Sequence, residues 1–187
     1  MPEPVRKDGP ATGPSSRSTS LHELSPPANT DVAVKKEELL NVVGLFGTCG
    51  NSQWRRGPEE KLRGLGIEFF DPVVPNWTPE CAEKEAKHLK KDRALLFVVT
   101  SETEGYGSLA ETGWAELSTK ANGRKAFFVL EDYKDGDKPV DPKHAANRAR
   151  KLVKAHAKEN GASIYSNVDE AMAAVVEFMK DQKPANN

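Results

Sequence analysis

The chain of 187 residues has few cysteines, no long apolar run and almost no net charge. Only Cys49 and Cys81 occur, too few for a disulfide framework and without metal-site spacing, so both are interpreted as free thiols. No apolar stretch approaches the roughly 20 residues that span a bilayer. The N-terminus also lacks the apolar segment of a secretory signal. These absences predict a cytoplasmic protein that has no membrane partner.

The formal net charge of −1 gives no overall attraction to nucleic acid. Basic residues do gather between Pro142 and Asn160, but no aromatic residues are interleaved with them. We therefore interpret that stretch as a solvated helix face and expect no nucleic-acid partner.

Residues 1–37 are rich in Pro, Ser, Gly and Thr and show neither helical nor strand periodicity. Such a segment cannot bury enough apolar surface to offset the entropy of ordering it. We predict a disordered N-terminal tail over residues 1–37, followed by one α/β domain over residues 38–183.

Within the domain, short apolar runs alternate with longer amphipathic stretches, which is typical of strand–helix units in a parallel sheet. The predicted strands are Val42–Gly47, Ile67–Pro72, Ala94–Thr100, Ala126–Glu131 and Ser163–Ser166. The predicted helices are Gln53–Leu65, Pro79–Lys91, Leu109–Asn122, Pro142–Asn160 and Val168–Asp181. Right-handed crossovers then favour a flavodoxin-like, doubly wound sheet of five parallel strands in the order 2-1-3-4-5, an order that rests on analogy.

Local signals mark several of the helix ends. Thr78-Pro79 and Asp141-Pro142 each place a capping side chain before a proline suited to the first helical position. Asn122-Gly123 and Asn160-Gly161 supply residues that tolerate the left-handed conformation at a helix stop.

In open parallel sheets, ligands bind beyond the carboxyl ends of the strands, where the strand order reverses. This rule directs attention to the loops Thr48–Ser52, Val73–Thr78 and Ser101–Ser108. The long polar loop Asp132–Asp141 should open on the same edge and could act as a lid.

The third of these loops leads to Glu111. Gly105 and Gly107 flank Tyr106, so the backbone can approach a ligand while an aromatic ring projects toward it. A helix that begins after Ser108 would place Glu111 in its first turn, with the carboxylate at the switch point. The same spacing is an S-x-x-E capping box, in which the glutamate has only a structural role. Spacing alone leaves both interpretations open.

Three segments together resemble the nucleoside 2-deoxyribosyltransferase-like family in order and spacing. They read NVVGLFGTCGNSQWR, FFDPVVPNWTPE and DRALLFVVTSETEGYGSLAETGWAEL. The family element G-[ST]-x-x-E-x-G-x-A corresponds here to residues Gly107 to Ala115. The resemblance covers about Val42 to Tyr133, and it implies a flavodoxin-like fold.

The resemblance implies an enzyme that cleaves the N-glycosidic bond of a deoxynucleoside or its nucleotide. The deoxyribosyl group would pass to another free base or to water, and Glu111 would be the nucleophile. A carboxylate suits this role because it can trap an oxocarbenium-like C1′ as a covalent glycosyl-enzyme. Ser108 and the amide of Gly107 would hold the sugar or a 5′-phosphate. No metal or organic cofactor is implied.

The partner acid is expected on the helix before the third strand, where relatives have an aspartate. This chain has none there before Asp92, which we expect to end the helix and begin the strand. Glu85 is the nearest candidate for the second catalytic carboxyl group, although it also fits an ordinary solvated helix face. The chain departs from relatives in two further ways: it has no tyrosine in the first strand, and it has Gly105 where some have aspartate.

Small polar and aromatic residues near the same edge are the candidates for substrate binding. The full set is Gly47, Thr48, Asn51, Trp54, Asn76, Trp77, Tyr106, Gly107 and Ser108. Trp54 and Trp77 could stack on a base, or pack in the core. Arg55 and Arg56 could add charge or lie on the surface.

Two classes of function therefore remain open. The first is the deoxyribosyltransferase or N-glycoside hydrolase, whose partners are a nucleoside or nucleotide and a free base. The second is a non-catalytic module that binds or senses a nucleotide on the same fold. The resemblance is also compatible with a homo-oligomer, because relatives complete their pockets with residues of a neighbouring subunit.

Overall fold

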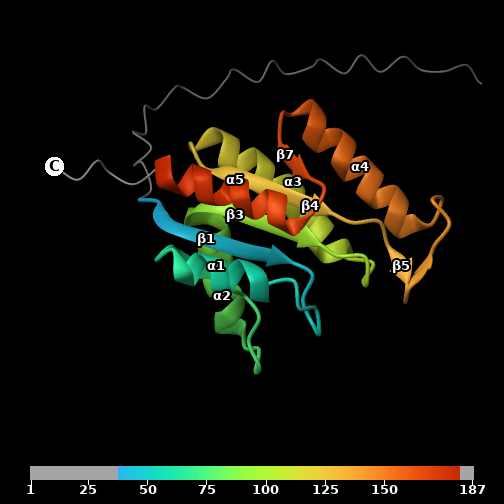
Figure 1. Cartoon of the computed structure of the whole chain (residues 1–187), viewed down its shortest axis with the longest axis horizontal. Helices are drawn as coiled ribbons and strands as arrows, with labels where there is room; N and C mark the ends of the chain where they lie inside the picture. Colours follow the sequence, from blue (N-terminus) through green and yellow to red (C-terminus); the bar gives the residue numbers. More distant parts are fainter. Residues whose placement is uncertain (1–37, 182–187) are drawn as a thin grey trace, which may run out of the picture. The chain divides into compact units, whose positions relative to one another are not determined.

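The computed structural model describes residues 38–181, which form an α/β domain around one parallel sheet (Figure 1). The sheet contains β1 (Leu40–Gly47), β2 (Glu68–Phe70), β3 (Asp92–Val99), β4 (Lys125–Leu130) and β7 (Ser163–Tyr165). All neighbouring strands are parallel, and their order is β2-β1-β3-β4-β7. The predicted flavodoxin-like, doubly wound fold is confirmed. The predicted tail, residues 1–37, lies outside the described residues, as do residues 182 and 183.

The helices cover both faces of the sheet (Figure 1). On one face, α1 (Arg56–Gly64) and α5 (Val168–Asp181) pack against the core. On the other face lie α2 (Pro79–Lys91), α3 (Tyr106–Ala121) and α4 (Ala145–Glu159). Because side chains alternate along a strand, β3 supplies Leu96 to the first core and Phe97 to the second. Burial on both faces explains why β3 and β4 are nearly continuous apolar runs.

Helix α1 begins at Arg56, three residues later than predicted. Pro58 gives the physical reason, because proline is tolerated in the first turn of a helix but breaks its interior. A start at Gln53 would have placed Pro58 in the interior. The predicted start was therefore wrong, and Arg55 is the residue before the helix.

Helix α3 begins at Tyr106, three residues earlier than predicted. Its N-cap residue is Gly105, which has a left-handed φ of 63°, and Leu109 N donates to Gly105 O at 2.9 Å. A Cβ at Gly105 would come within 2.6 Å of Val99 Cγ1, so glycine is required there for two reasons. Ser108 is thus inside the first turn, and the proposed capping box with Glu111 is wrong.

The other helix ends agree with the sequence except at α4. Thr78 occupies the N-cap position of α2, although its side chain makes no capping hydrogen bond, and Asn122 and Asn160 are the C-caps of α3 and α4. The predicted start of α4 at Pro142 is wrong: Asp141 Oδ1 accepts from Lys143 N at 2.7 Å in a local turn, and the helix begins at Ala145. The predicted loop Asp132–Asp141 contains a small antiparallel hairpin, β5 (Lys134–Asp135) with β6 (Lys138–Pro139).

Candidate active site

Glu111 is half-buried in the second turn of α3, not in the first turn as the sequence suggested. Its side chain makes no capping hydrogen bond. Burial raises the pKa of Glu111, and the nearby charge of Glu85 raises it further. A carboxyl group that is held away from water beside a second carboxyl group is a candidate for acid–base or nucleophilic chemistry.

Glu85 lies on α2, which packs beside α3. It is half-buried, whereas its neighbours Glu83 and Lys84 are exposed, so the interpretation as a fully solvated helix face does not hold at this position. Burial raises the pKa of Glu85, and the positive charge of Arg55 lowers it. The structure thus brings the two predicted catalytic carboxyl groups close enough for the charge of Glu85 to act on Glu111, and Arg55 close enough to act on Glu85.

Arg55, for which the sequence left open a charged role in the site or a place on the surface, is buried beside the candidate site. Its side chain is buried and donates to the carbonyl oxygens of Leu45 at 3.1 Å and Thr48 at 2.6 Å. Its Nε also lies 3.1 Å from Asp71 Oδ1, and a cavity of about 120 Å³ opens beside this pair. Arg55 therefore joins the carboxyl end of β1 to the residue that follows β2, on the edge where the doubly wound fold reverses.

Gly47 and Thr48, both predicted to bind substrate, hold the carboxyl ends of β1 and β3 together. A Cβ at Gly47, whose φ is 121°, would lie 2.0 Å from Val98 O, so the close approach of the two backbones requires glycine. Thr48 is buried, and its hydroxyl accepts from Thr100 N at 3.0 Å. The structure gives both residues a role in supporting the loops of the site.

Arg150, on α4, fixes the loop that leads into α3. It is fully buried, and within residues 38–181 its hydrogen bonds go to backbone carbonyl oxygens. The acceptors are Thr100 at 3.1 Å, Thr103 at 2.6 Å, Glu104 at 2.8 Å, Glu131 at 2.6 Å and Ala146 at 3.3 Å. Burial lowers the pKa of Arg150. One side chain thereby sets the path of the chain from β3 to the start of α3, which carries Glu111.

The remaining predicted binding residues fall into two groups. Trp54 donates from Nε1 to Thr48 O at 2.9 Å and packs against the α1–α5 core, on the opposite face of the sheet from α2 and α3. It is therefore not brought together with Glu111. Exposed or half-buried residues of the loops after β1 and β2 and of the first turn of α3 form the second group: Asn51, Asn76, Trp77, Tyr106, Gly107 and Ser108. Trp77 is 64% exposed, which leaves its ring free to stack on a flat ligand.

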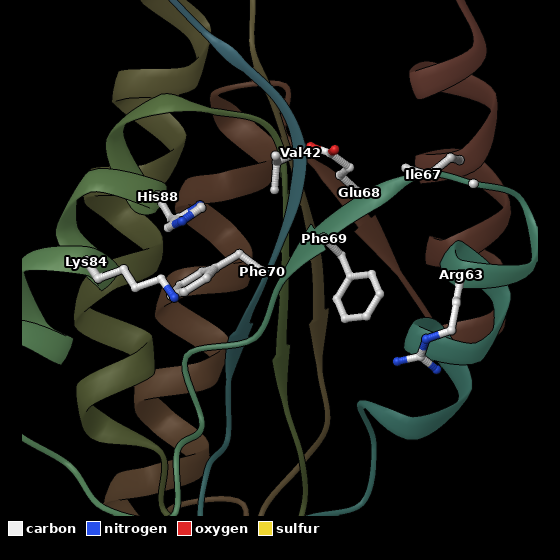
Figure 2. A pocket seen from close by; sticks show the side chains of 9 residues that line it. Val42, Arg63, Ile67, Glu68, Phe69, Phe70, Lys84 and His88 are labelled. Carbon is white, nitrogen blue, oxygen red and sulfur yellow. The ribbon is translucent and has the colours of Figure 1, made fainter.

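A cavity of about 560 Å³ lies away from the two glutamates, along the free edge of β2 (Figure 2). Figure 2 shows the Phe70 ring beside Lys84 and His88, with Phe69 on the side of Arg63. The Phe70 and His88 rings stack at 3.8 Å. The volume of this cavity would suit a binding site, but neither Glu85 nor Glu111 lines it. The two glutamates are therefore kept as the candidate site, because ligands of doubly wound sheets bind where the strand order reverses.

His88 lines this cavity and also contacts the carboxyl group of Asp92, which is fully buried. Its Nδ1 lies 2.9 Å from Asp92 Oδ1, and Asp92 is the first residue of β3, as the sequence predicted. Burial raises the pKa of Asp92 to about 7, although the charge of Arg124 opposes the shift. The folded protein therefore holds a proton at Asp92 at pH values where the unfolded chain releases it.

Asp92→Asn is expected to change how stability depends on pH. Because the folded pKa of about 7 exceeds the ordinary value of 3.8, the wild type loses stability as pH rises between these values. At pH 8 the asparagine variant should be the more stable protein, by up to about 4 kcal/mol. Urea denaturation at several pH values from 4 to 8 measures the difference. Parallel curves for the two proteins would contradict the shifted pKa.

Comparisons with known proteins add no assignment: no family model matches this chain, and no curated protein matches it at a significant level. Among residues 38–181, no three His, Cys, Asp or Glu side chains are grouped as a metal site requires. In the same range, none of the helices combines the length and the apolar character needed to cross a bilayer. The functional assignment therefore depends on the residues of the site.

Proposed function

We propose that this protein cleaves the N-glycosidic bond of 2′-deoxynucleosides or their 5′-monophosphates and transfers the deoxyribosyl group to a second base or to water. The observation that carries the proposal is the pairing of Glu85 and Glu111, two half-buried carboxyl groups on adjacent helices whose pKa values are both raised. This pairing matches the family resemblance of the segment around Glu111. It also supplies the two groups that a retaining glycosyl transfer needs.

In the proposed reaction, the ionised Glu111 carboxylate attacks C1′ of the deoxyribose. The bond between C1′ and the base nitrogen breaks, and its electron pair leaves with the base. Glu85, whose pKa burial raises, is the acid in this step and donates a proton to the leaving base. In the second half, Glu85 removes a proton from water or from the acceptor base, which then attacks C1′ and releases Glu111.

The loop after β2 and the first turn of α3 supply the proposed substrate contacts. Trp77 and Tyr106 are both exposed, and aromatic rings at these positions suit a flat heterocycle. The first-turn amides of α3, including those of Gly107 and Ser108, suit the sugar oxygens or a 5′-phosphate, because a helix N-terminus favours negative charge.

Chromatography of reaction mixtures tests this function. The purified full chain is incubated with each 2′-deoxynucleoside and each 5′-monophosphate, with and without a second free base. We expect release of free base by the wild type, and a new nucleoside when an acceptor base is present. Glu83→Gln, which removes an exposed carboxyl group from α2, is the matched control and should react like the wild type.

The outcomes separate the open alternatives. Free base without a new nucleoside makes the protein a hydrolase, and a new nucleoside makes it a transferase. No turnover on any substrate, combined with saturable binding of a nucleotide, would reject the enzyme and support the non-catalytic binding module.

A further inference from the structure

Helix α3 carries almost no charge on the side that faces away from the sheet. Eight of its residues are exposed, and only Lys120 among them is charged: Tyr106, Gly107, Ala110, Gly113, Trp114, Leu117, Lys120 and Ala121. Lys120 lies near the end of the helix, where its Nζ donates to Asn160 O at 3.1 Å. The exposed residues of α5, in contrast, are mostly charged: Asp169, Glu170, Ala173, Glu177, Lys180 and Asp181. A helix that is apolar on its outer side as well as on its inner side is typically covered by other protein.

Trp114 and Leu117 make this outer side of α3 apolar as well as uncharged. Trp114 is 47% exposed and Leu117 is 66% exposed. Residues three positions apart on a helix are neighbours on its surface, so the two side chains form one patch. The neighbouring helices carry charges, such as Glu83 on α2 and Arg148 on α4, which are both exposed. An apolar patch with a polar rim is typical of a surface that binds another protein.

Gly113, in the middle of the same outer side, is not required by its own chain. Its φ is not in the left-handed region, and a Cβ added to it would meet no atom of the described chain within 4 Å. Glycine inside a helix is less stable than alanine, so a glycine that neither conformation nor packing requires needs another reason. Close approach of a second backbone or of a large side chain from outside the chain is such a reason.

Gly113 and Trp114 are consecutive residues, so one surface offers both an opening and a large side chain that can fill it. A two-fold axis brings the same surface of two copies together, and each copy then supplies both parts of the contact. We propose that the outer side of α3 is the interface of a homodimer, in which Trp114 of each copy packs over Gly113 of the other. A second copy is the partner because this side of α3 complements itself and has no pattern of charges that would select a different protein.

The size of this face is sufficient for a stable dimer. The 16 residues of α3 extend over about 24 Å. Helix α3 contacts both α2 and α4, and packed helices lie about 8–10 Å apart, so the face of these three helices measures roughly 24 by 28 Å. Its area is of the same order as the roughly 800 Å² that each partner contributes to a standard interface.

Sedimentation velocity and light scattering on the full chain, over concentrations from about 0.1 to 100 μM, test the proposal. We expect the mass to rise from that of the monomer, 20.5 kDa, to twice this value with a Kd of about 1 μM or below. Trp114→Glu is expected to raise this Kd by about 100-fold or more, because it removes the central apolar side chain and places a charge in the interface. Ala173→Glu introduces the same charge at an exposed position of α5 and should dimerise like the wild type.

Gly113→Ala separates an effect on the interface from an effect on folding. The added methyl group is expected to raise the Kd of the dimer by about 10-fold or more, because it occupies the space of the partner's tryptophan. The monomer should unfold at the same or a higher temperature, because alanine favours a helix over glycine. Gly64→Ala changes another exposed glycine with open space around it, at the end of α1, and should leave the dimer unchanged.

Three results would overturn the proposal. One is a wild-type protein that remains a monomer at about 100 μM, whether or not its apolar face binds lipid vesicles or another protein. Another is a dimer that Trp114→Glu leaves intact, which would place the interface elsewhere. The third is a dimer that Gly113→Ala does not weaken, which would exclude close packing at this glycine. None of these measurements depends on glycosidic cleavage, so this proposal and the proposed function can fail separately.

Discussion

Glu111→Gln is expected to lower the rate of glycosidic cleavage by about 10⁴-fold or more while the folded protein becomes no less stable. The loss of rate follows because an amide cannot form the glycosyl-enzyme that a carboxylate forms at C1′. The stability follows from the raised pKa of Glu111, which shows that its ionised form is disfavoured in the folded protein. Steady-state kinetics and thermal unfolding on the same preparations measure the two effects.

The effect on stability has a defined direction with pH. The folded pKa of Glu111 lies above its ordinary value of 4.5, so the wild type loses stability as pH rises through that interval. The glutamine variant lacks this loss and should be relatively more stable above it. Glu83→Gln, which removes an exposed carboxyl group, should change neither rate nor stability. An active Glu111→Gln protein would exclude the nucleophile, and an inactive, destabilised one would indicate a structural role.

The fold could be predicted from the sequence because its signals are local. Long apolar runs identify β3 and β4, whose two faces are both covered by helices. Helix α2 has its predicted bounds because Thr78 and Pro79 define its start. The start of α3 was wrong because S-x-x-E spacing at Ser108 imitates a capping box. The real N-cap, Gly105, is selected by tight packing against Val99, which no local pattern reveals.

The site could be predicted only in part. Glu111 was predicted from the family resemblance and Glu85 from its place on the preceding helix, and the structure brings these two candidates close together. The ion pair of Arg55 with Asp71 was missed, because the two residues meet across two neighbouring strands and are 16 positions apart in the chain. An arginine beside a helix start and an aspartate at the end of the adjacent strand would have been the available signal, since parallel strands bring both to one edge.

Arg150 was also missed, for a different reason. Its partners are backbone carbonyl oxygens. Because every residue has such an oxygen, these contacts cannot be recognised from the sequence. On its own helix it is indistinguishable from Arg148, which is exposed. Only the path of the loop between β3 and α3 shows which of the two arginines is buried.

Arg150→Met is accordingly expected to destabilise the protein by about 3–5 kcal/mol, because it leaves several buried carbonyl oxygens without donors. Arg150→Lys should recover little of this, since an ammonium group cannot reach acceptors both at Glu131, which follows β4, and in the loop after β3. Arg148→Met is the matched control on α4 and should unfold like the wild type. Urea denaturation measures the stabilities, and hydrogen exchange should show faster exchange in residues 101–105 of the lysine variant. If Arg150→Met unfolded at the same urea concentration as Arg148→Met, the buried guanidinium would not be what holds this loop, and the placement of Glu111 would need another cause.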